Sequence, residues 1–424
     1  MRDGNAHCAG ATTAGIPPGV RAADDAGRQF GIFPPVPVRC RSQSADSAPR
    51  YARSRFIFRP GEVGGALGDL GTFLPYVIAA ITVVGMNPTG VLVSFGLFYL
   101  AAAAVYGVPM GVQPMKAASA VALVQYMAPG EVAGAGLVIG AFFLVAGATG
   151  GVTRLARIVP RAVTAGIQLG LGASLAFLGL RLLAETIWIG VAVCAVMLAL
   201  LRNPRVPAAI AGLAAGIALA YAAGTLPPFP DIRPGIYLPH LVWPAWEDVL
   251  RGARHLAVPQ IPLTLTNAII VTAAITRDLF PKELHGVDER SLALSTGIGN
   301  LLAAPIGGFP MCHGAGGIAA HYRFGARSAT APALMGIACL CLGLFLGDDA
   351  TAVLSLVPPA VLGALLVFSG LELASPANTL GGGGRDRPVA LGVAALSIIT
   401  NPAVAFIAGL AVALAADRLA RRRA

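Results

Sequence analysis

The sequence predicts an all-α polytopic membrane protein with about 14 membrane segments, arranged as two inverted seven-segment repeats around two short broken helices. The composition is the first reason, because 56% of the 424 residues are hydrophobic and only 12% are charged, whereas a soluble domain carries roughly 25% charged residues. The second is a series of long charge-free stretches, of which residues 70–115 suffice for two crossings joined at Asn87-Pro88, since one crossing needs about 20 residues. The third is a pair of segments too short to cross, at matching places in the two halves, as in membrane proteins with a central binding site.

The apolar stretches define the candidate membrane segments. The 53 glycines and 32 prolines are compatible with this class, because neighbouring helices in a bundle re-satisfy the freed backbone groups. Residues 1–55 are polar and aperiodic, so we expect a disordered N-terminal tail without the apolar core of a signal peptide. The expected segments are 63–85, 89–106, 114–128, 131–150, 160–181, 186–201, 206–223, 256–276, 290–305, 314–322, 328–347, 358–374 and 388–416, the last divided at Asn401-Pro402.

Basic residues in the loops predict the topology. Arginine or lysine follows the fourth, sixth, eighth and tenth segments, and arginines flank both chain ends, which places both termini in the cytoplasm. Half of the net charge of +10 lies in residues 1–59, so the charge indicates a membrane surface rather than nucleic acid. An even number of segments makes the halves opposite in orientation. We therefore expect a first repeat at 60–223, a linker at 224–255, a second repeat at 256–416 and a basic cytoplasmic tail at 417–424.

No motif indicates an enzyme, a cofactor or a metal. The six cysteines lack metal-ligand spacing, and four of them lie in apolar segments, where they fit as small hydrophobic side chains. Nucleotide-binding loops, zinc-protease motifs and nucleophile elbows are all missing from the sequence. Transport, if that is the function, is therefore expected to be secondary.

The first short segment contains the run VQPMK at residues 112–116. Proline suits the first turn of a helix, and the free N–H groups of a helix start attract anions. Gln113 can donate hydrogen bonds, and Lys116 adds a full positive charge. Lys116 is interpreted either as an anion ligand or as a lysine that extends to the membrane interface.

The second short segment contains the run PMCHGAGG at residues 310–317. Its opening, GFPM at 308–311, echoes GVPM at 107–110 in the first half. Gly314, Gly316 and Gly317 expose backbone N–H groups and permit close approach of a ligand, and His313 can donate to an oxyanion. The alternative is glycine-mediated helix packing around a satisfied histidine.

Acidic and hydroxyl side chains add to these candidates. Glu62 and Asp69 are seven residues apart on one helix face, and a buried acid in a membrane needs a partner or a proton. Asp69 is either a coupling carboxylate or an internal partner for Lys116 or an arginine. Polar groups beside proline occur in the first segment of each half, where they offer hydrogen bonds to substrate or join helices: Thr72, Thr264, Thr266 and Asn267.

Three strings resemble a known family: GDLGT at 68–72, VQPMKA at 112–117, and 310–317 continued by YRFGAR at 322–327. They are similar to the molybdate transporter family of plants and bacteria, a branch of the sulfate-permease superfamily, over about residues 60–416. The resemblance implies the fold of sulfate and uracil permeases, with a core domain, a gate domain, and substrate between the N-termini of the third and tenth segments. The chain ends at Ala424 without the regulatory C-terminal domain of typical sulfate permeases, so we expect no regulation of that kind.

The leading hypothesis is import of molybdate across the inner membrane, with sulfate and tungstate as competing tetrahedral oxyanions. We expect proton symport, with Asp69 and Glu62 as the coupling carboxylates, Asp69 as the proton carrier, and His313 as a substrate contact. The alternatives are a proton-coupled carrier of an organic acid or nucleobase, and a membrane receptor or scaffold that does not transport. The expected partners are the oxyanion, the coupling proton and the lipid bilayer, and the oligomeric state, a homodimer included, stays open.

Overall fold

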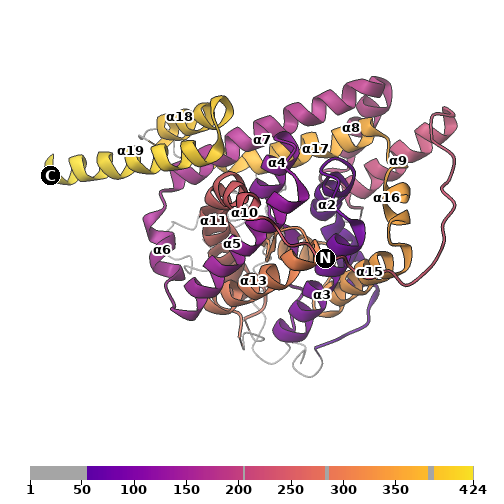
Figure 1. Cartoon of the computed structure of the whole chain (residues 1–424), viewed down its shortest axis with the longest axis horizontal. Coiled ribbons are helices and arrows are strands. Elements are labelled where there is room, and N and C mark those ends of the chain that lie inside the picture. The colour runs from indigo at the N-terminus through magenta and orange to yellow at the C-terminus, as the bar shows by residue number, and fades with distance from the viewer. Residues whose placement is uncertain (1–54, 204–205, 282–285, 381–385, 424) are drawn as a thin grey trace, which may run out of the picture.

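The computed structural model describes residues 55–203, 206–281, 286–380 and 386–423, and these are almost entirely helical (Figure 1). The expected N-terminal tail lies outside the described residues, apart from residue 55. The first half consists of α2 (Pro60–Thr82), α3 (Pro88–Tyr106), β1 (Gln113–Pro114), α4 (Lys116–Val124), α5 (Pro129–Ala148), α6 (Val152–Ile158), α7 (Arg161–Leu183), the 3₁₀ turn η1 (Ala184–Thr186), α8 (Ile187–Leu200) and α9 (Ala208–Ala222).

The second half begins with one long helical stretch that changes type along its length. It contains two π-helical stretches, and π-bulges inside helices are frequent at functional sites. The elements are α10 (Trp246–Gly252), the π-helix η2 (Ala253–Ala257), α11 (Val258–Leu263), the π-helix η3 (Thr264–Ile270), α12 (Val271–Leu279), α13 (Glu289–Ala303), the 3₁₀ turn η4 (Ala304–Ile306), β2 (Met311–Cys312), α14 (Ala315–Arg323), α15 (Thr330–Leu346), α16 (Asp349–Leu354), α17 (Pro359–Ala374), the 3₁₀ turn η5 (Ser375–Thr379), α18 (Asp386–Ile399) and α19 (Pro402–Arg423).

Six helical stretches of the described chain are long and apolar enough to cross a membrane. They span residues 60–82, 88–106, 129–148, 161–200, 246–279 and 359–378. Shorter apolar helices cover 208–222, 330–346 and 402–415. The chain is therefore a mostly helical, multi-pass membrane protein, while the number of segments and their assignment to two repeats stay predictions.

Two expected boundaries differ from the observed ones. The segment expected at 256–276 begins at Trp246 instead, so the end of the expected linker is helical. Charged residues in the first turns, Glu247 and Asp248, concealed this start because the prediction looked for apolar residues. The segment expected at 388–416 consists of α18 and α19, and the latter continues to Arg423 through most of the expected tail.

Glycines set the closest helix crossings. α3 packs on α15 where Gly96 meets Gly336, and α5 packs on α13 where Gly140 meets Gly297. An added Cβ at any of these four positions would lie within 3.0 Å of the facing helix, so the helix axes approach because no side chain intervenes. α7 and α17 run side by side along one edge of the molecule (Figure 1), and they touch at Gly172 and Gly370.

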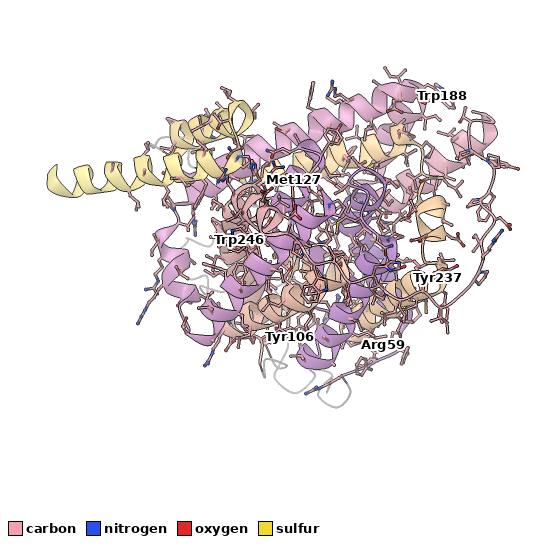
Figure 2. The ribbon with its side chains drawn as sticks, in the orientation of Figure 1. Arg59, Tyr106, Met127, Trp188, Tyr237 and Trp246 are labelled. Atoms are coloured by element: carbon pink, nitrogen blue, oxygen red, sulfur yellow. The ribbon has the colours of Figure 1, made fainter. Side chains whose placement is uncertain are left out.

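The outer surface is apolar and carries aromatic residues at helix ends. Large hydrophobic side chains such as Phe177, Leu198 and Tyr221 are mostly exposed, which suits lipid as the surrounding solvent. Trp188, the second residue of α8, lies at the edge of the molecule (Figure 2), and Trp246, which begins α10, is also exposed. Tryptophan is enriched where a helix meets the membrane interface.

The two short segments meet at the centre. β1 and β2 pair antiparallel, with Gln113 opposite Cys312 and Pro114 opposite Met311. The Met115 N–H donates to the Pro310 carbonyl at 2.9 Å. Each strand leads directly into a nine-residue helix, α4 or α14. The predicted combination of an extended stretch with a short helix is therefore confirmed in both halves.

Candidate anion site

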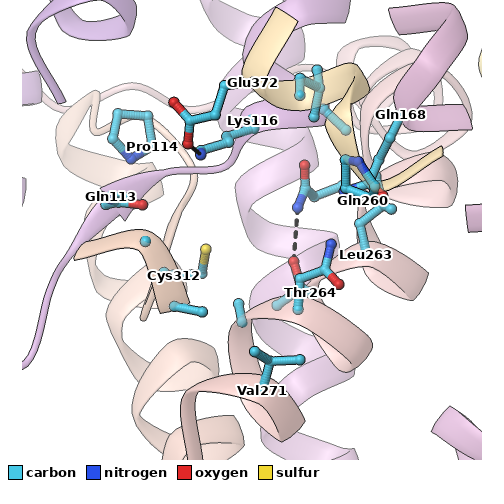
Figure 3. Close-up of a pocket in the computed structure, with 18 residues that line it drawn as sticks. Gln113, Pro114, Lys116, Gln168, Gln260, Leu263, Thr264, Val271, Cys312 and Glu372 are labelled. Atoms are coloured by element: carbon cyan, nitrogen blue, oxygen red, sulfur yellow. Dashed lines mark hydrogen bonds and ion pairs between the residues drawn. The ribbon is translucent and has the colours of Figure 1, made fainter. Parts of the chain in front are cut away.

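A cavity of about 80 Å³ lies where α4 and α14 begin (Figure 3). One water molecule needs roughly 10–15 Å³ of such space, so the cavity has room for a small polyatomic ion. Its wall comes from both halves of the chain: Gln113, Pro114, Lys116, Ala117, Gln168, Gln260, Leu263, Thr264, Asn267, Ala268, Val271, Cys312, Gly314, Ala315, Gly316, Glu372, Leu373 and Pro376.

The strand pairing brings two helix starts to this cavity. Helix α4 begins at Lys116 and α14 at Ala315, and both residues line the cavity. The first N–H groups of a helix have no partner within the helix, and each N-terminus acts as roughly half a positive charge. The Ala118 N–H of α4 is taken by Gln260 Oε1 at 2.9 Å. The two helix starts together favour an anion in the cavity.

Lys116 already has an anionic partner inside the cavity. Its Nζ forms an ion pair with Glu372 Oε1, from the last turn of α17 (Figure 3). The side chains are 22% and 13% exposed, so both remain within reach of water. The partner considered for Lys116 from the sequence was Asp69, and the structure shows Glu372 in that place.

Asp69 belongs to a separate network behind the cavity wall. Its carboxylate is fully buried and accepts from the Tyr99 hydroxyl at 2.7 Å and from Gln113 Nε2 at 2.7 Å. The Thr72 hydroxyl lies 3.1 Å from Asp69 Oδ1, and His321 Nε2 lies 3.3 Å from Oδ2. The carboxylate therefore has partners on both oxygens and does not line the cavity.

This network also determines what Gln113 presents to the cavity. Its side-chain nitrogen donates to Asp69 and to Thr72, so both amide N–H groups point inward. The side-chain oxygen then faces Gly314, where an added Cβ would meet it at 2.2 Å. In this conformation both donors of Gln113 are used inside the protein, and its role as a donor to an anion stays a prediction.

The His313 side chain points away from the cavity. It is fully buried, with Nε2 2.8 Å from Ser295 Oγ and Nδ1 3.3 Å from the Gly111 carbonyl. Its ring packs against Phe98 and Tyr106. The satisfied-histidine interpretation describes this placement, and the role of His313 as a substrate contact stays a prediction.

Strand alternation explains the orientation of His313. Successive side chains of an extended stretch point to opposite faces. Cys312 and Gly314 both line the cavity, so the residue between them faces the other way.

The π-helix η3 supplies polar groups from the opposite wall. Thr264 and Asn267 line the cavity, and Thr264 Oγ1 accepts from Gln260 Nε2 at 2.8 Å. Thr266 is turned away, and its hydroxyl donates to the Pro262 carbonyl at 3.0 Å. The Thr266 hydroxyl thus bonds to the backbone of its own helical stretch, and its part in binding substrate or joining helices stays a prediction.

The three predicted glycines differ in what surrounds them. A Cβ on Gly316 would lie 3.7 Å from Gln113 Oε1 and 3.9 Å from Lys116 Nζ, so this position opens onto the cavity. A Cβ on Gly317 would meet Gly111 Cα at 2.9 Å. Gly317 therefore permits the crossing of two backbones, whereas Gly314 and Gly316 border the site.

Glu62 lies away from the cavity, at the start of α2. Its Oε1 accepts from the Arg327 backbone N–H at 2.9 Å. The side chain is buried, and this contact ties the start of α2 to the loop that follows α14. Its predicted part in proton coupling stays a prediction.

The structure therefore brings together some of the predicted residues and separates others. Gln113, Lys116, Thr264, Asn267, Gly314 and Gly316 line the cavity, whereas Thr72, Thr266, His313, Gly317, Asp69 and Glu62 are outside its lining. Sequence reasoning missed Glu372, Gln168 and Gln260. A signal existed for Glu372, because it ends the charge-free run 350–371, and ionisable residues at membrane depth are commonly functional.

The fold and the site define a multi-pass transporter of anions. A profile described as "Molybdate transporter of MFS superfamily" matches residues 61–175 and 252–373, more than half of the chain. The chain belongs to the molybdate transporter family, and the resemblance found in its motifs is confirmed. It is 32% identical to molybdate transporter 2 of Arabidopsis thaliana over 74% of this chain and 78% of that protein. Molybdate transporter 1 of the same plant is 30% identical over 84% and 88%.

Solved structures support the fold at low sequence identity. The transmembrane domain of the cyanobacterial bicarbonate transporter BicA matches with a TM-score of 0.63 and 16% identity, covering 84% of this chain and 98% of that one. The murine Slc26a9 anion transporter in its inward-facing state matches with a TM-score of 0.63 and 13% identity, covering 89% and 74%. The family match makes the chain a transporter rather than an enzyme, and the solved structures show that its fold is like that of these two anion transporters.

Proposed function

We propose that the chain imports molybdate across the inner membrane by proton symport and binds it in the cavity between α4 and α14. The observation that carries the proposal is the convergence of two helix N-termini and Lys116 on that cavity. Thr264, Asn267 and the open position at Gly316 complete the polar wall. The curated relatives named as molybdate transporters support molybdate over other tetrahedral oxyanions.

The proposal includes two inverted seven-segment repeats with about 14 segments, as the sequence predicts. Helix packing supports this. In an inverted repeat, each helix of the first half has a counterpart in the second, and here α3 would correspond to α13 and α5 to α15. A contact between α3 and α15 must then have an equivalent contact between α13 and α5. Both crossings exist, and a glycine from each helix lies at the contact in both cases. The antiparallel pair β1–β2 lies between them, as expected at the axis of such a repeat.

Electrical work is the reason for a coupling cation. A negative-inside potential opposes entry by about 2.3 kcal/mol per charge per 100 mV, so a dianion meets about 4.6 kcal/mol. Two protons cancel both charges, and each adds about 1.4 kcal/mol per unit of pH gradient. Accumulation of a dianion therefore requires protons or another cation.

Uptake measurements test the proposal. Cells that lack their own molybdate importers are made to produce the chain, and accumulation of labelled molybdate is followed with sulfate and tungstate as competitors. The matched control is the double variant Lys116→Ala/Glu372→Gln, which removes the cavity cation and its partner together. We expect saturable uptake that the double variant loses at equal protein level. Uptake at the level of cells without the chain contradicts the proposal, and complete inhibition by equimolar sulfate extends the substrate range to sulfate.

A further inference from the structure

The cavity contains a carboxylate where an anion binds. Among the residues that line the described cavity, Lys116 is the cation and Glu372 the anion, and they are paired with each other. A dianion that enters between α4 and α14 approaches the same Nζ that Glu372 contacts. Oxyanion and carboxylate therefore compete for one ammonium group.

Charge decides the outcome of this competition. With Glu372 ionised, the charges of Lys116 and Glu372 sum to zero, and a bound dianion gives the cavity a net charge of −2. Glu372 lies in the last turn of α17, at the negative end of a helix dipole, so its charge is held there by Lys116. If the oxyanion pairs with Lys116, a proton on Glu372 removes the repulsion between the oxyanion and the carboxylate. The net charge of the cavity is then −1.

We propose that Glu372 is the proton-coupling site of the transporter: it takes up one proton as the oxyanion displaces it from Lys116. In this step the ion pair between Glu372 and Lys116 breaks and an ion pair between the oxyanion and Lys116 forms. The proton comes from water on the side of entry and binds a Glu372 carboxylate oxygen. On release of the oxyanion the proton leaves to the other side, and the original pair forms again. The inference rests on the proposed function.

The surroundings of Glu372 leave Lys116 as its main electrostatic partner. Among the described residues, Tyr76 of α2 and Cys312 of β2 are titratable groups near it. Of the remaining packed elements, α7 contributes the neutral Gln168 to the cavity. Glu372 lies near the C-terminal end of α17, whereas α8, α9 and η1 contact the N-terminal half of that helix, around Gly363. Glu185 of η1 is therefore remote from Glu372.

Glu372 fits a proton carrier better than Asp69 does. Its side chain is 13% exposed within the cavity, whereas Asp69 is fully buried. Asp69 accepts hydrogen bonds from three other side chains and lies beside His321. A proton can therefore reach Glu372 from cavity water, whereas protonation of Asp69 would disturb a satisfied network.

Binding of molybdate at several pH values tests the inference. The full chain is purified in detergent, and its Kd for molybdate is measured by calorimetry between roughly pH 6 and pH 8. Uptake of one proton on binding weakens the wild-type affinity by about tenfold for each unit of pH increase. In Glu372→Gln we expect this slope to disappear and the affinity at the alkaline end to exceed that of the wild type.

Two carboxylate variants are the matched controls. Glu131→Gln changes a buried carboxylate that pairs with Arg251 at 3.2 Å outside the cavity, and Asp69→Asn changes the carboxylate indicated by the sequence. Both should retain the slope. If Glu372→Gln retains the wild-type slope, or if Asp69→Asn alone removes it, Glu372 is not the proton site. Should Asp69→Asn fail to fold, the comparison of Glu372→Gln with Glu131→Gln decides alone.

The failure of the inference is distinct from the failure of the proposed function. Molybdate binding with no pH slope in the wild type contradicts proton uptake at Glu372 but leaves the anion site intact. No binding to the wild type at any pH contradicts the anion site itself. In proteoliposomes, Glu372→Gln should still exchange internal for external molybdate while losing accumulation driven by an inward proton gradient, and accumulation equal to the wild type overturns the inference.

Discussion

Gly316→Ala separates binding at the cavity from stability of the fold. The added Cβ would lie 3.9 Å from Lys116 Nζ and 3.7 Å from Gln113 Oε1, which are ordinary contact distances. The backbone therefore does not need to move. Gly316 lies in the first turn of α14, where replacement of glycine by alanine stabilises the fold by about 0.4–1 kcal/mol through the unfolded chain.

The same methyl group occupies space beside the ammonium group. An oxyanion oxygen must come within about 2.7–2.9 Å of Nζ to form a charge-assisted hydrogen bond, and the methyl group reduces the room for it. Such a contact contributes roughly 1.5–3 kcal/mol, so we expect the Kd for molybdate to rise by about tenfold to about a hundredfold.

Calorimetry and thermal unfolding in the same detergent measure the two effects. The matched control is Gly317→Ala, whose Cβ would lie 2.9 Å from Gly111 Cα. This variant should lose about 1–3 kcal/mol of stability through overpacking, together with its binding. A Gly316→Ala protein that binds molybdate as the wild type does would refute the placement of substrate beside Lys116.

Four further substitutions test the charges and the packing. Lys116→Ala should weaken binding by about tenfold or more and also lower the Tm, because it leaves Glu372 without its cation. The double variant Lys116→Ala/Glu372→Gln should regain the wild-type Tm but not the wild-type affinity. An unchanged Kd in either variant would show that Lys116 is only an anchor. Lys116→Arg should not restore full affinity, since the planar fork needs more room, and wild-type Kd would contradict this. Asp69→Asn should lower stability by roughly 1–3 kcal/mol, because it replaces one carboxylate oxygen by an NH2 group that faces a partner which already donates, either the Tyr99 hydroxyl or Gln113 Nε2. An unchanged Tm would contradict the network. Gly140→Ala should separate α5 from α13 and lower the Tm by overpacking, and a Tm equal to the wild type would show that this crossing adapts.

The local features of the site could be predicted from the sequence. Proline followed by a small-residue run marks a helix start, so the broken segments around Lys116 and Gly316 follow from nearby residues alone. The orientation of His313 was also available in principle, because alternation in the run before α14 places Cys312 and His313 on opposite faces. The expectation of a substrate contact instead assumed that all polar groups of this extended stretch face the ligand.

The long-range features could not be predicted in the same way. Lys116 and Glu372 are 256 residues apart, and they meet only because α17 packs on α7 beside the start of α4. The direction of the Gln113 amide likewise depends on Asp69, which lies on another helix. One sequence shows that such residues are polar at membrane depth, but it does not show which of them face each other.

The charges in the cavity connect substrate choice with coupling. The fold is similar to that of a bicarbonate transporter and of another anion transporter, and a fold of this kind does not by itself select the anion. A monoanion that displaced Glu372 from Lys116 would give the cavity a net charge of −1 with Glu372 still ionised. A dianion would give the same net charge only after Glu372 takes up a proton. The proposed exchange at Lys116 therefore makes the proton a requirement for the doubly charged substrate. One pair of side chains, Lys116 and Glu372, would then link the charge of the substrate to the dependence of its import on a proton gradient.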